Sequence, residues 1–469
     1  MRTQTENLLK FREDVKLKTS RRFSEKTLLS FVSRVDSINF DSILYSQQNT
    51  KGSFFYWNIP ANNFTIFCSD SIFSISESGT QRAENTEKRI SAFQNNFFSN
   101  WEEFNISSVP LIVGGMKFST DDNNELWQDF ADSEWKIPKN ILLKDSSGSF
   151  LITNFFLSDS IEDVTKSFCS GYELLTNDKT NGTHELRYYK VVDQNIDEEK
   201  LSWTEKVNSA LNKISKNEIQ KIVLSRKVQL KFESTPTLYK MLSKLSIDFP
   251  KCYVFAFKNN NSIFFGASPE KLAKISNGWI EADALAGSFP RGKDLFEDEI
   301  FEKELLNSKK NLAEQKAVVE FIEESFKDFS DEIIYEKEPI IRKLSNIQHL
   351  WTPIKAKLNK QYTIFHLLKS IHPTPAICGA PWTVALNNIK QLENFERGLF
   401  AGITGWFNFE NEGEFAVSIR SALLKGNNLF AFAGCGIVEG SDPDLEFEET
   451  ELKLKPILSL FENEKEYQS

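Results

Sequence analysis

The chain has 469 residues, of which 40% are hydrophobic and 26% are charged, and its formal net charge is −10. This acidic balance argues against a nucleic acid or an anionic membrane as a partner. No stretch approaches the roughly 18 apolar residues of a membrane-spanning helix, and the polar start lacks the apolar core of a secretory signal. Five widely spaced cysteines without a CxxC pair are typical of a reduced, cytoplasmic protein.

The first 200 residues predict a scaffold without a recognisable chemical constellation. Residues 1 to about 50 have apolar side chains at helical spacing, which predicts one or two amphipathic helices. Strands are expected from Ser53 onward, followed by a helix over 83–104. A buried strand is predicted at Val109–Phe118, and two more strands follow it. Residues 159–200 are polar and are expected to form a connecting region.

A lysine interrupts the first strand predicted in the second half of the chain. This β-branched strand covers Ile219–Phe232 and follows a helix over 201–217. Lys221 lies inside the strand, between Ile219 and Val223 on one face. Such a lysine is commonly a strand-end charge whose amine reaches solvent. The alternative is a desolvated amine whose pKa is lowered, so that it acts as a base near neutral pH.

A carboxylate ends the hairpin that is predicted across Asn259–Asn261. Glu270 follows the apolar second strand and is commonly read as a loop charge. If the apolar strands enclose Glu270, its pKa rises and it can act as a general acid. The next strand contains the small residues Ala286, Gly287 and Ser288, which either leave room for a ligand or form a tight turn.

A second carboxylate lies on the apolar side of a charged helical region over 294–328. Glu314 is in line with the apolar stripe that contains Val318 and Ile322. A glutamate on the buried side of a helix is a candidate metal ligand. Its expected partner is Glu449, near the C-terminus.

An arginine marks the strand-rich last third of the chain. A strand is predicted over Asn346–Leu358, a helix over 384–393 and a further strand over Glu414–Leu424. On that last strand Arg420 shares a face with small side chains, as on the floor of a cavity. A guanidinium in such a place suits a carboxylate ligand.

The C-terminal stretch GCGIVEGSDPDLEFEETELKLK combines a glycine-rich segment with a helix. Glycine turns can direct backbone N–H groups at an anion. The spacing of Glu446, Glu449 and Lys453 places all three on one helix face. Leu445 and Leu452 flank that face, so it is expected to point partly inward. Inward carboxylates need a positive partner, either a divalent cation or a tightly paired base.

Motifs between about 220 and 455 resemble, in the same order, those of the chorismate-utilising enzymes. They are KIVLSR (Lys221–Arg226), FGASPEKL (Phe265–Leu272), ALAGSFPRG (Ala284–Gly292), ELLNSKKNLAEQ (Glu304–Gln315), HPTPAICGAP (His372–Pro381), RGLFAGITGW (Arg397–Trp406), VSIRSA (Val417–Ala422) and AGCGIVEGSDPDLEFEETELKL (Ala433–Leu454). The resemblance implies a single large α+β domain, in which antiparallel sheets are sandwiched together, helices pack outside and a deep pocket is buried. Residues 1–200 would form the N-terminal part of this fold, and residues 201–465 the chorismate-binding catalytic region.

Four positions indicate which reaction of the family to expect. Amine-transferring members typically lack a lysine at the place of Lys221, and aminodeoxychorismate synthases have a nucleophilic lysine where this chain has Ala286. Salicylate synthases tend to have threonine at the place of Ala376 and tyrosine at that of Phe400. The resemblance therefore implies an isochorismate synthase activity that serves menaquinone or siderophore biosynthesis.

The resemblance also implies a mechanism with chorismate as substrate and Mg²⁺ as cofactor. Glu314 and Glu449 would hold Mg²⁺, often through waters, and Glu446 would support them. Lys221 would activate a water for addition at C2, and Glu270 would protonate the departing C4 hydroxyl. The residues implied in substrate binding are Gly287, Ser288, His349, Ala376, Phe400, Arg420, Gly434, Gly436 and Lys453.

Two departures from the family pattern keep other hypotheses open. Family members commonly read KDRAEH where this chain reads KNLAEQ, so Asn311 replaces an acid and Gln315 replaces a histidine. The alternatives are a salicylate synthase, which also eliminates pyruvate, and a catalytically silent chorismate-binding subunit. The retained Lys221, Glu270 and Glu314 argue against the silent subunit. The resemblance implies no glutaminase subunit, and a monomer or homodimer is expected.

Overall fold

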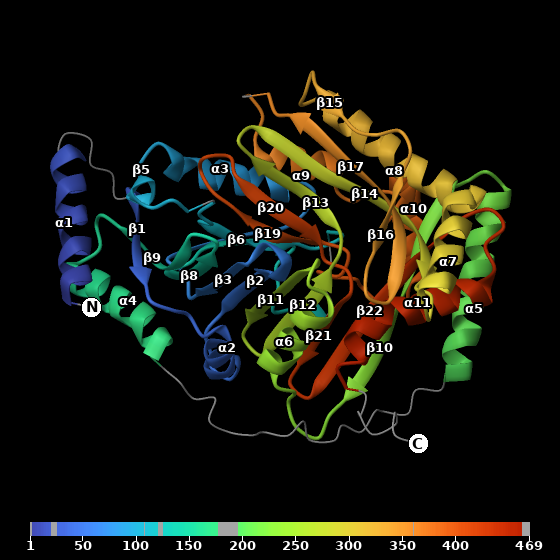
Figure 1. Cartoon of the computed structure of the whole chain (residues 1–469), viewed down its shortest axis with the longest axis horizontal. Coiled ribbons are helices and arrows are strands. Elements are labelled where there is room, and N and C mark those ends of the chain that lie inside the picture. The colour runs from blue at the N-terminus through green and yellow to red at the C-terminus, as the bar shows by residue number, and fades with distance from the viewer. Residues whose placement is uncertain are drawn as a thin grey trace.

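The computed structural model describes residues 2–19, 26–106, 108–120, 125–176, 196–359 and 361–461, and within them two large β-sheets have helices on their outer faces (Figure 1). In sheet order, the strands of the first sheet are β18 (Gly379–Ala380), β10 (Lys221–Lys231), β22 (Asn428–Ile437), β21 (Ser421–Lys425), β12 (Ser262–Ser268), β11 (Tyr253–Asn259), β2 (Phe54–Ile59), β3 (Phe64–Ser69), β8 (Asn140–Asp145), β9 (Gly148–Phe156), β1 (Leu28–Val35) and β5 (Phe97–Ser99). Those of the second sheet are β15 (Ile333–Ile334), β17 (Ile347–Lys357), β14 (Trp279–Pro290), β13 (Lys271–Ser276), β20 (Gly413–Val417), β19 (Ile403–Phe407), β6 (Ile112–Met116), β7 (Ser133–Ile137) and β4 (Phe73–Glu77), with β16 (Ile340–Lys343) paired to β17.

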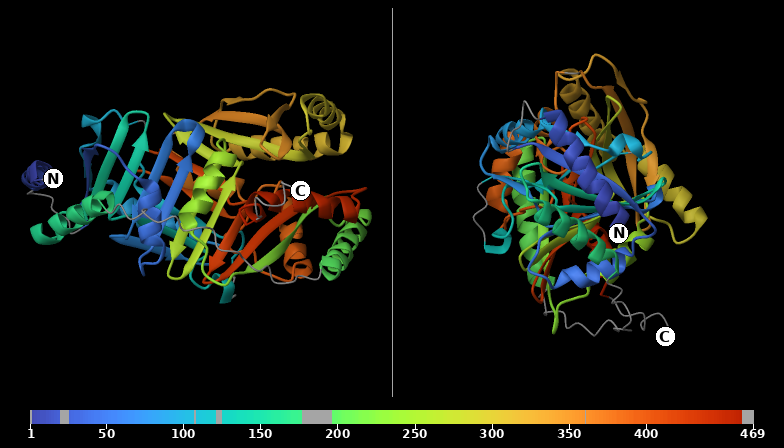
Figure 2. Two further views of the ribbon diagram at one scale, coloured as in Figure 1. Left: turned by 60° about the horizontal axis from the view of Figure 1, so that its bottom comes forward. Right: turned by 90° about the vertical axis from the view of Figure 1, so that its left-hand side faces the viewer.

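The α-helices of the described residues are spread along the whole chain. They are α1 (Arg2–Thr19), α2 (Phe40–Gln48), α3 (Arg82–Gln94), α4 (Ile161–Thr176), α5 (Ile196–Ser215), α6 (Leu238–Asp248), α7 (Leu295–Asn307), α8 (Lys309–Lys327), α9 (Ile364–Ile371), α10 (Trp382–Leu392) and α11 (Pro443–Leu458). In Figures 1 and 2, α5, α7 and α11 gather at one end of the molecule, and α1 and α4 lie at the other. No helix within the described residues is long and apolar enough to cross a membrane.

Strands from both halves of the chain build both sheets. In the first sheet β2 pairs with β11, and in the second sheet β6 pairs with β19. These pairings are antiparallel, whereas β1 and β5 pair in parallel. The two halves therefore share one hydrogen-bonded framework, which confirms the predicted single α+β domain with sandwiched, largely antiparallel sheets.

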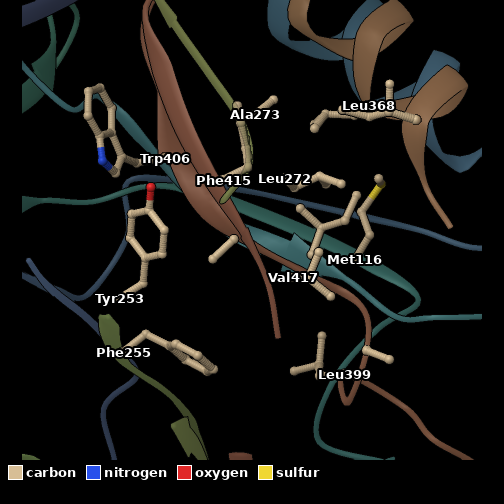
Figure 3. Packing of buried hydrophobic residues seen from close by; sticks show 14 of the residues in the cluster. Met116, Tyr253, Phe255, Leu272, Ala273, Leu368, Leu399, Trp406, Phe415 and Val417 are labelled. Carbon is tan, nitrogen blue, oxygen red and sulfur yellow. The ribbon is translucent and has the colours of Figure 1, made fainter. Parts of the chain in front are cut away.

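The core has two layers, one on each face of the first sheet, and the side chains of β2 contribute to both. Successive side chains of a strand point to opposite faces, so Phe55 and Trp57 pack between the two sheets, while Phe54 and Tyr56 pack under the outer helices. Figure 3 shows the layer between the sheets, where Trp406 from the second sheet is one of the packed side chains. All six residues of β2 are buried for this reason, and its sequence lacks a polar alternation.

Three predictions for the first 200 residues need correction. The segment 1–50 contains β1 between α1 and α2, because Leu28–Val35 pairs with β9 on one side and with β5 on the other and is buried on both faces. The helix predicted over 83–104 ends at Gln94 and is followed by β5. The segment 159–200 contains α4 and the start of α5; residues 177–195 of it lie outside the described residues.

The chain changes sheets at Arg420, where the sequence pattern predicts one continuous strand. β20 belongs to the second sheet and ends at Val417, and β21 belongs to the first sheet and begins at Ser421. Arg420 has a φ of 52°, a left-handed conformation that is uncommon for a residue other than glycine. The prediction of a strand over Glu414–Leu424 is therefore wrong, and Arg420 lies at the junction of the two sheets.

Candidate functional site

A cavity opens between the two sheets at the end of the molecule where β10, β22 and β14 meet α8 and α11. It encloses about 650 Å³ of space between atoms, including its open mouth. Of the predicted site residues, twelve line this cavity, namely Glu270, Gly287, Ser288, Glu314, His349, Ala376, Phe400, Arg420, Gly434, Gly436, Glu449 and Lys453. The remaining two, Lys221 and Glu446, lie beside it and form ion pairs with Lys or Glu side chains.

Glu270 is enclosed where the chain passes from the first sheet to the second. It follows β12 and directly precedes β13, and its backbone N–H donates to the Ser268 hydroxyl at 3.2 Å. Only 4% of the residue is exposed. Burial raises the pKa of Glu270 to about 7, although the nearby Arg420 guanidinium favours the ionised form. The carboxyl can therefore carry a proton near neutral pH.

Lys221 and Glu314 form an ion pair across the cavity wall. Lys221 begins β10, and its Nζ lies 2.7 Å from Oε1 of Glu314 on α8. Burial opposes the charge of Glu314, but the ammonium groups of Lys221, Lys453 and Lys310 together outweigh burial and lower the pKa of that carboxyl. A Cβ at Gly436 would lie 2.8 Å from Cε of Lys221 and 3.0 Å from Oε1 of Glu314. The pair therefore needs a glycine at position 436.

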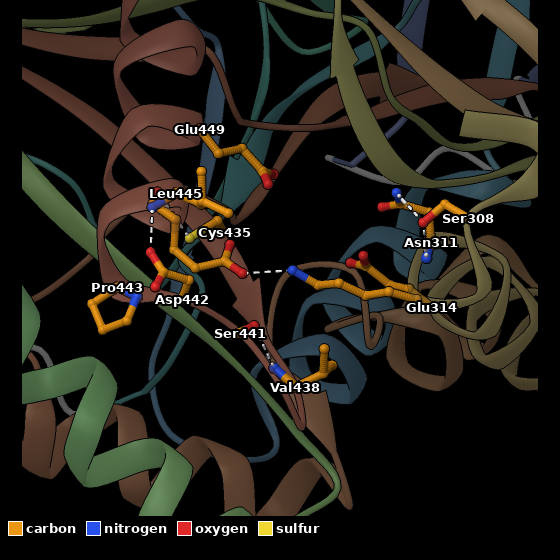
Figure 4. Close-up of polar contacts among 12 residues, drawn as sticks. Ser308, Asn311, Glu314, Cys435, Val438, Ser441, Asp442, Pro443, Leu445 and Glu449 are labelled. Carbon is orange, nitrogen blue, oxygen red and sulfur yellow. Dashed lines mark hydrogen bonds and ion pairs between the residues drawn. The ribbon is translucent and has the colours of Figure 1, made fainter. Parts of the chain in front are cut away.

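The two glutamates on one face of α11 pair with two different lysines. Glu449 Oε1 lies 2.6 Å from Nζ of Lys453, which also donates to the Gly434 carbonyl at 3.0 Å. Glu446 is buried and pairs instead with Lys310 of α8 at 2.6 Å. Figure 4 shows the carboxylates of Glu449 and Glu314 directed into the space between α11 and α8.

One helix-face prediction for α11 is wrong. Leu445 is 65% exposed, so it does not mark the inward face of the helix. The buried residues of α11 include Glu446, Thr450 and Leu454, which lie four residues apart, and Phe447 beside them. The inward face is therefore rotated away from Leu445, and Glu446 itself is one of its buried members.

The backbone of β22 presents amide groups to the cavity. Its pairs with β10 include Gly434 with Ser225 and Gly436 with Val223. The backbone N–H groups of Ser225 and Val223 donate away from β22, to Glu393 and to the Cys378 carbonyl. In such antiparallel pairs both members turn their N–H groups outward. The glycine N–H groups consequently point away from β10, on the side where Lys453 meets the Gly434 carbonyl.

Arg420 and His349 supply a cation and a neutral ring to the same cavity. Burial lowers the pKa of Arg420 to about 10, so its guanidinium stays charged near neutral pH. Burial also lowers the pKa of His349 well below its usual value, with Arg420 as a further cause. His349 Nδ1 lies 3.1 Å from the Gly287 carbonyl, which can only accept, so Nδ1 carries the hydrogen. Nε2 is then an unprotonated, buried acceptor without a partner among the described residues.

The carboxylates of the cavity can be tested as a metal site by their chemistry. Within the described residues, no three His, Cys, Asp or Glu side chains gather closely enough to enclose a metal ion. Mg²⁺ commonly uses only one or two protein carboxylates and takes its other oxygen ligands from water and substrate. Glu314 and Glu449 both line the cavity and provide such oxygens. This donor set fits Mg²⁺, whereas Glu446 is outside the lining and is held by Lys310.

Sequence reasoning missed two polar residues of the lining, Ser225 and Arg397. Arg397 is buried and donates to Glu393 and to the carbonyls of Ile377 and Val223, so it fixes the cavity wall. Its position in the motif RGLFAGITGW was visible, but its role depends on Glu393, which lies outside that motif. The Ser225 hydroxyl is buried without a partner within the described chain, and no pattern in the sequence distinguishes it.

The two departures from the family pattern have local structural explanations. Gln315 donates from Nε2 to the Ala284 carbonyl at 2.9 Å and to the Thr352 hydroxyl at 3.1 Å. Asn311 lies over Gly287 and donates to the hydroxyl of Ser308, which caps α8. Ser308 also divides the predicted helical region 294–328 into α7 and α8. Glu314 keeps its place in the cavity despite both changes.

Known proteins resemble this chain over half of its length or more. The family model described as "Chorismate binding enzyme" matches residues 14–462. "Isochorismate synthase MenF" of Bacillus subtilis is 31% identical, over 97% of this chain and 98% of that protein. "Salicylate biosynthesis isochorismate synthase" of Pseudomonas aeruginosa is 37% identical over 55% of this chain and 54% of that protein.

A solved structure shares the fold. It is the menaquinone-specific isochorismate synthase MenF of Escherichia coli, which covers 97% of this chain and 100% of its own, with a TM-score of 0.76 and 22% identity. This likeness concerns the fold, whereas the family model spans both sheets and every predicted site residue. The chain therefore belongs to the chorismate-binding enzyme family.

Proposed function

We propose that this protein is an isochorismate synthase, which converts chorismate to isochorismate. The observation that carries the proposal is the similarity to an isochorismate synthase along almost the full length of both chains. The polar composition of the cavity supports it. Its cations and backbone N–H groups suit a substrate with two carboxylates, and its enclosed carboxyl can supply a proton. The MenF name of that relative favours the menaquinone branch over the siderophore branch.

Glu270 acts as the general acid. Its carboxyl is protonated near neutral pH because of burial, and it faces the cavity. Protonation of the C4 hydroxyl turns that group into water, which leaves as the ring double bond shifts. Glu270 is then ionised, and Arg420 is among the charges that favour this form.

Lys221 acts as the general base on the water that adds at C2. For this step the Lys221 ammonium first releases a proton to solvent, and its neutral Nζ then takes a proton from this water as the new C–O bond forms, so one hydroxyl enters as another leaves. The product is therefore an isomer of the substrate, and proton exchange with solvent restores both groups. Lys221 is held at the cavity wall by Glu314, at 2.7 Å, which places its amine at one end of the site.

Substrate orientation is assigned to the remaining lining residues. Arg420 and the N–H groups of Gly434 and Gly436 hold carboxylate oxygens, and Lys453 adds a further positive charge. Glu314 and Glu449 would hold Mg²⁺, which when bound supplies positive charge to the ring carboxylate. Gly287, Ser288, His349, Ala376 and Phe400 complete the walls around the ring.

Place of action and assembly complete the proposal. All five cysteines are free, which supports action in a reducing compartment such as the cytoplasm. Water is the nucleophile, so no glutaminase subunit is required. We propose a monomer or a homodimer that takes chorismate as its small-molecule substrate and binds neither nucleic acid nor a membrane.

Isotope incorporation tests this chemistry directly. The reaction is run in ¹⁸O-labelled water with Mg²⁺, and the product is examined by mass spectrometry. Water addition predicts one ¹⁸O atom in isochorismate, at C2. An unlabelled product would contradict water addition and would point to internal transfer of the C4 hydroxyl.

A further inference from the structure

Asp283 is a buried carboxylate beside the cavity that the proposed mechanism leaves unused. It lies on β14, and residues 285–288 of the same strand line the cavity. Its side chain is 2% exposed, and its Oδ2 accepts from Arg342 of β16 at 2.7 Å. Its Oδ1 is buried without a hydrogen-bond partner within the described chain. A buried carboxylate with one oxygen that lacks a hydrogen bond lowers the free energy of unfolding, so Asp283 is present at a cost to stability.

The pairing of β13 with β14 brings Asp283 close to Glu270. Lys274 is opposite Glu281 in this antiparallel pair, so continuing the register places Asp283 level with the start of β13. Glu270 directly precedes the first residue of β13. The charge of Asp283 also reaches Lys271 and Tyr253, which lie on the strands around that point. Asp283 and Glu270 are therefore neighbouring carboxyl groups beside the start of β13.

Three cations face Glu270 and favour its ionised form. They come from separate elements, with Arg420 at the junction of the sheets, Lys221 on β10 and Lys453 on α11. Among the charged groups that act on Glu270 most strongly, Asp283 is the one that opposes its ionisation. Burial acts in the same direction as Asp283. Without the negative charge of Asp283, the surrounding cations would favour the ionised form of Glu270 more strongly.

We propose that Asp283 is a positioning residue that keeps Glu270 protonated between turnovers. The inference rests on the proposed role of Glu270 as general acid. Two neighbouring carboxyl groups in a dry site do not both ionise readily. The Arg342 guanidinium pairs with the Asp283 carboxylate at 2.7 Å, so the proposal leaves the proton on Glu270. Arg342 thus acts on Glu270 indirectly, through Asp283.

The test is the pH dependence of kcat/KM in variants of Asp283. Because Glu270 works in its protonated form, activity falls as pH rises through its pKa. Asp283→Asn is expected to move this alkaline limb to lower pH by about one unit, a shift that corresponds to a tenfold change in the ionisation equilibrium. Asp283→Glu keeps the negative charge and is expected to restore the limb to its wild-type position.

A second variant guards against loss of folding. Asp283→Asn combined with Arg342→Gln removes both charges, so no buried charge is left unpaired, and the same limb shift is expected. Asp298→Asn is the matched control, since Asp298 is buried and paired with Arg291 at 2.7 Å outside the cavity. It is expected to lower stability and leave the alkaline limb in place.

The outcomes separate this inference from the proposed function. An unmoved limb in the folded double variant, with Glu270→Gln inactive, would overturn the role of Asp283 and leave the general acid intact. Full activity in Glu270→Gln would instead overturn the role of Glu270, and the inference with it. A lower kcat at every pH without a limb shift would identify Asp283 as structural only, against the proposal.

Discussion

Nζ of Lys221 lies 2.7 Å from Oε1 of Glu314, and this contact joins two groups with different proposed roles. The lysine belongs to a strand of the first sheet, and the glutamate belongs to a helix that packs on the second. Glu449 and Lys453 repeat the arrangement on α11 at 2.6 Å. Each carboxylate proposed as a metal ligand is therefore balanced by a lysine of the same site.

Removal of either proposed proton-transfer group is expected to stop catalysis without unfolding the protein. Lys221→Ala and Glu270→Gln should each lower kcat by about a hundredfold or more, the usual contribution of general acid–base groups. Lys258→Met is the matched control, because Lys258 is also a buried lysine but donates to the carbonyls of Thr50 and Gly52, away from the cavity. It should lose stability and keep kcat. Full activity in either test variant would contradict its assignment.

The stability of the protein is expected to depend on pH through Glu270. Its pKa is raised from 4.5 to about 7 in the folded protein, so the folded state holds this proton more tightly than the unfolded chain. The resulting stabilisation is complete below about pH 4.5 and is lost as pH rises through 7. Relative to that of the wild type, the free energy of unfolding of Glu270→Gln should therefore rise between pH 5 and 8.5 by on the order of 3 kcal/mol.

Urea unfolding of both proteins at the two pH values measures this difference. A parallel pH dependence in the wild type and in Glu270→Gln would show that Glu270 is not protonated in the folded state. Circular dichroism on each sample confirms that both begin folded.

Mg²⁺ is expected to stabilise the protein through Glu314. A ligand that binds only the folded state raises the melting temperature with its concentration. Glu314→Gln should abolish this rise, and EDTA should stop turnover by the wild type. Glu320→Gln on the same helix is the control, because Glu320 is exposed and pairs with Lys316 on the surface. A Mg²⁺ response that survives in Glu314→Gln would remove Glu314 from the metal site.

A methyl group at position 436 is expected to displace the Lys221–Glu314 pair. The added Cβ would approach both side chains to 3.0 Å or less, and these flexible chain ends can move while the strand keeps its fold. Misplacement of the base by about 1 Å costs on the order of a hundredfold in rate. Gly440→Ala should instead keep activity, because a Cβ at Gly440 meets open space, and should lose about 1 kcal/mol from its positive φ. Wild-type kinetics in Gly436→Ala would show that the pair can shift freely.

The individual strands were largely predictable, whereas their assignment to sheets was not. The hairpin at Asn259–Asn261 and the strand that contains Lys221 follow from local pattern and turn residues. Arg420 could not be placed, because the apolar alternation continues on both sides of it while the chain crosses between sheets. β1 was missed because a strand that is buried on both faces has no alternation.

The residues of the cavity were foreseeable, but the pairing between separate elements was not. Motifs and local pattern identified Glu270, Glu314 and Glu449 as unusual carboxylates, and all three line the cavity. Which lysine meets which glutamate depends on contacts between segments far apart in sequence, such as Lys310 with Glu446. Sequence spacing carries no information about such contacts, so the Lys221–Glu314 pair emerged only from the fold, whereas the i,i+4 spacing had already placed Glu449 and Lys453 on one helix face.

The product formed from chorismate is the most direct test of the central claim. Purified protein is incubated with chorismate and Mg²⁺, and the products are separated and identified by mass. The account predicts isochorismate as the enzymatic product, formed by Glu270→Gln about a hundredfold or more slowly. Salicylate with an equimolar amount of pyruvate, or binding of chorismate without turnover, would contradict it.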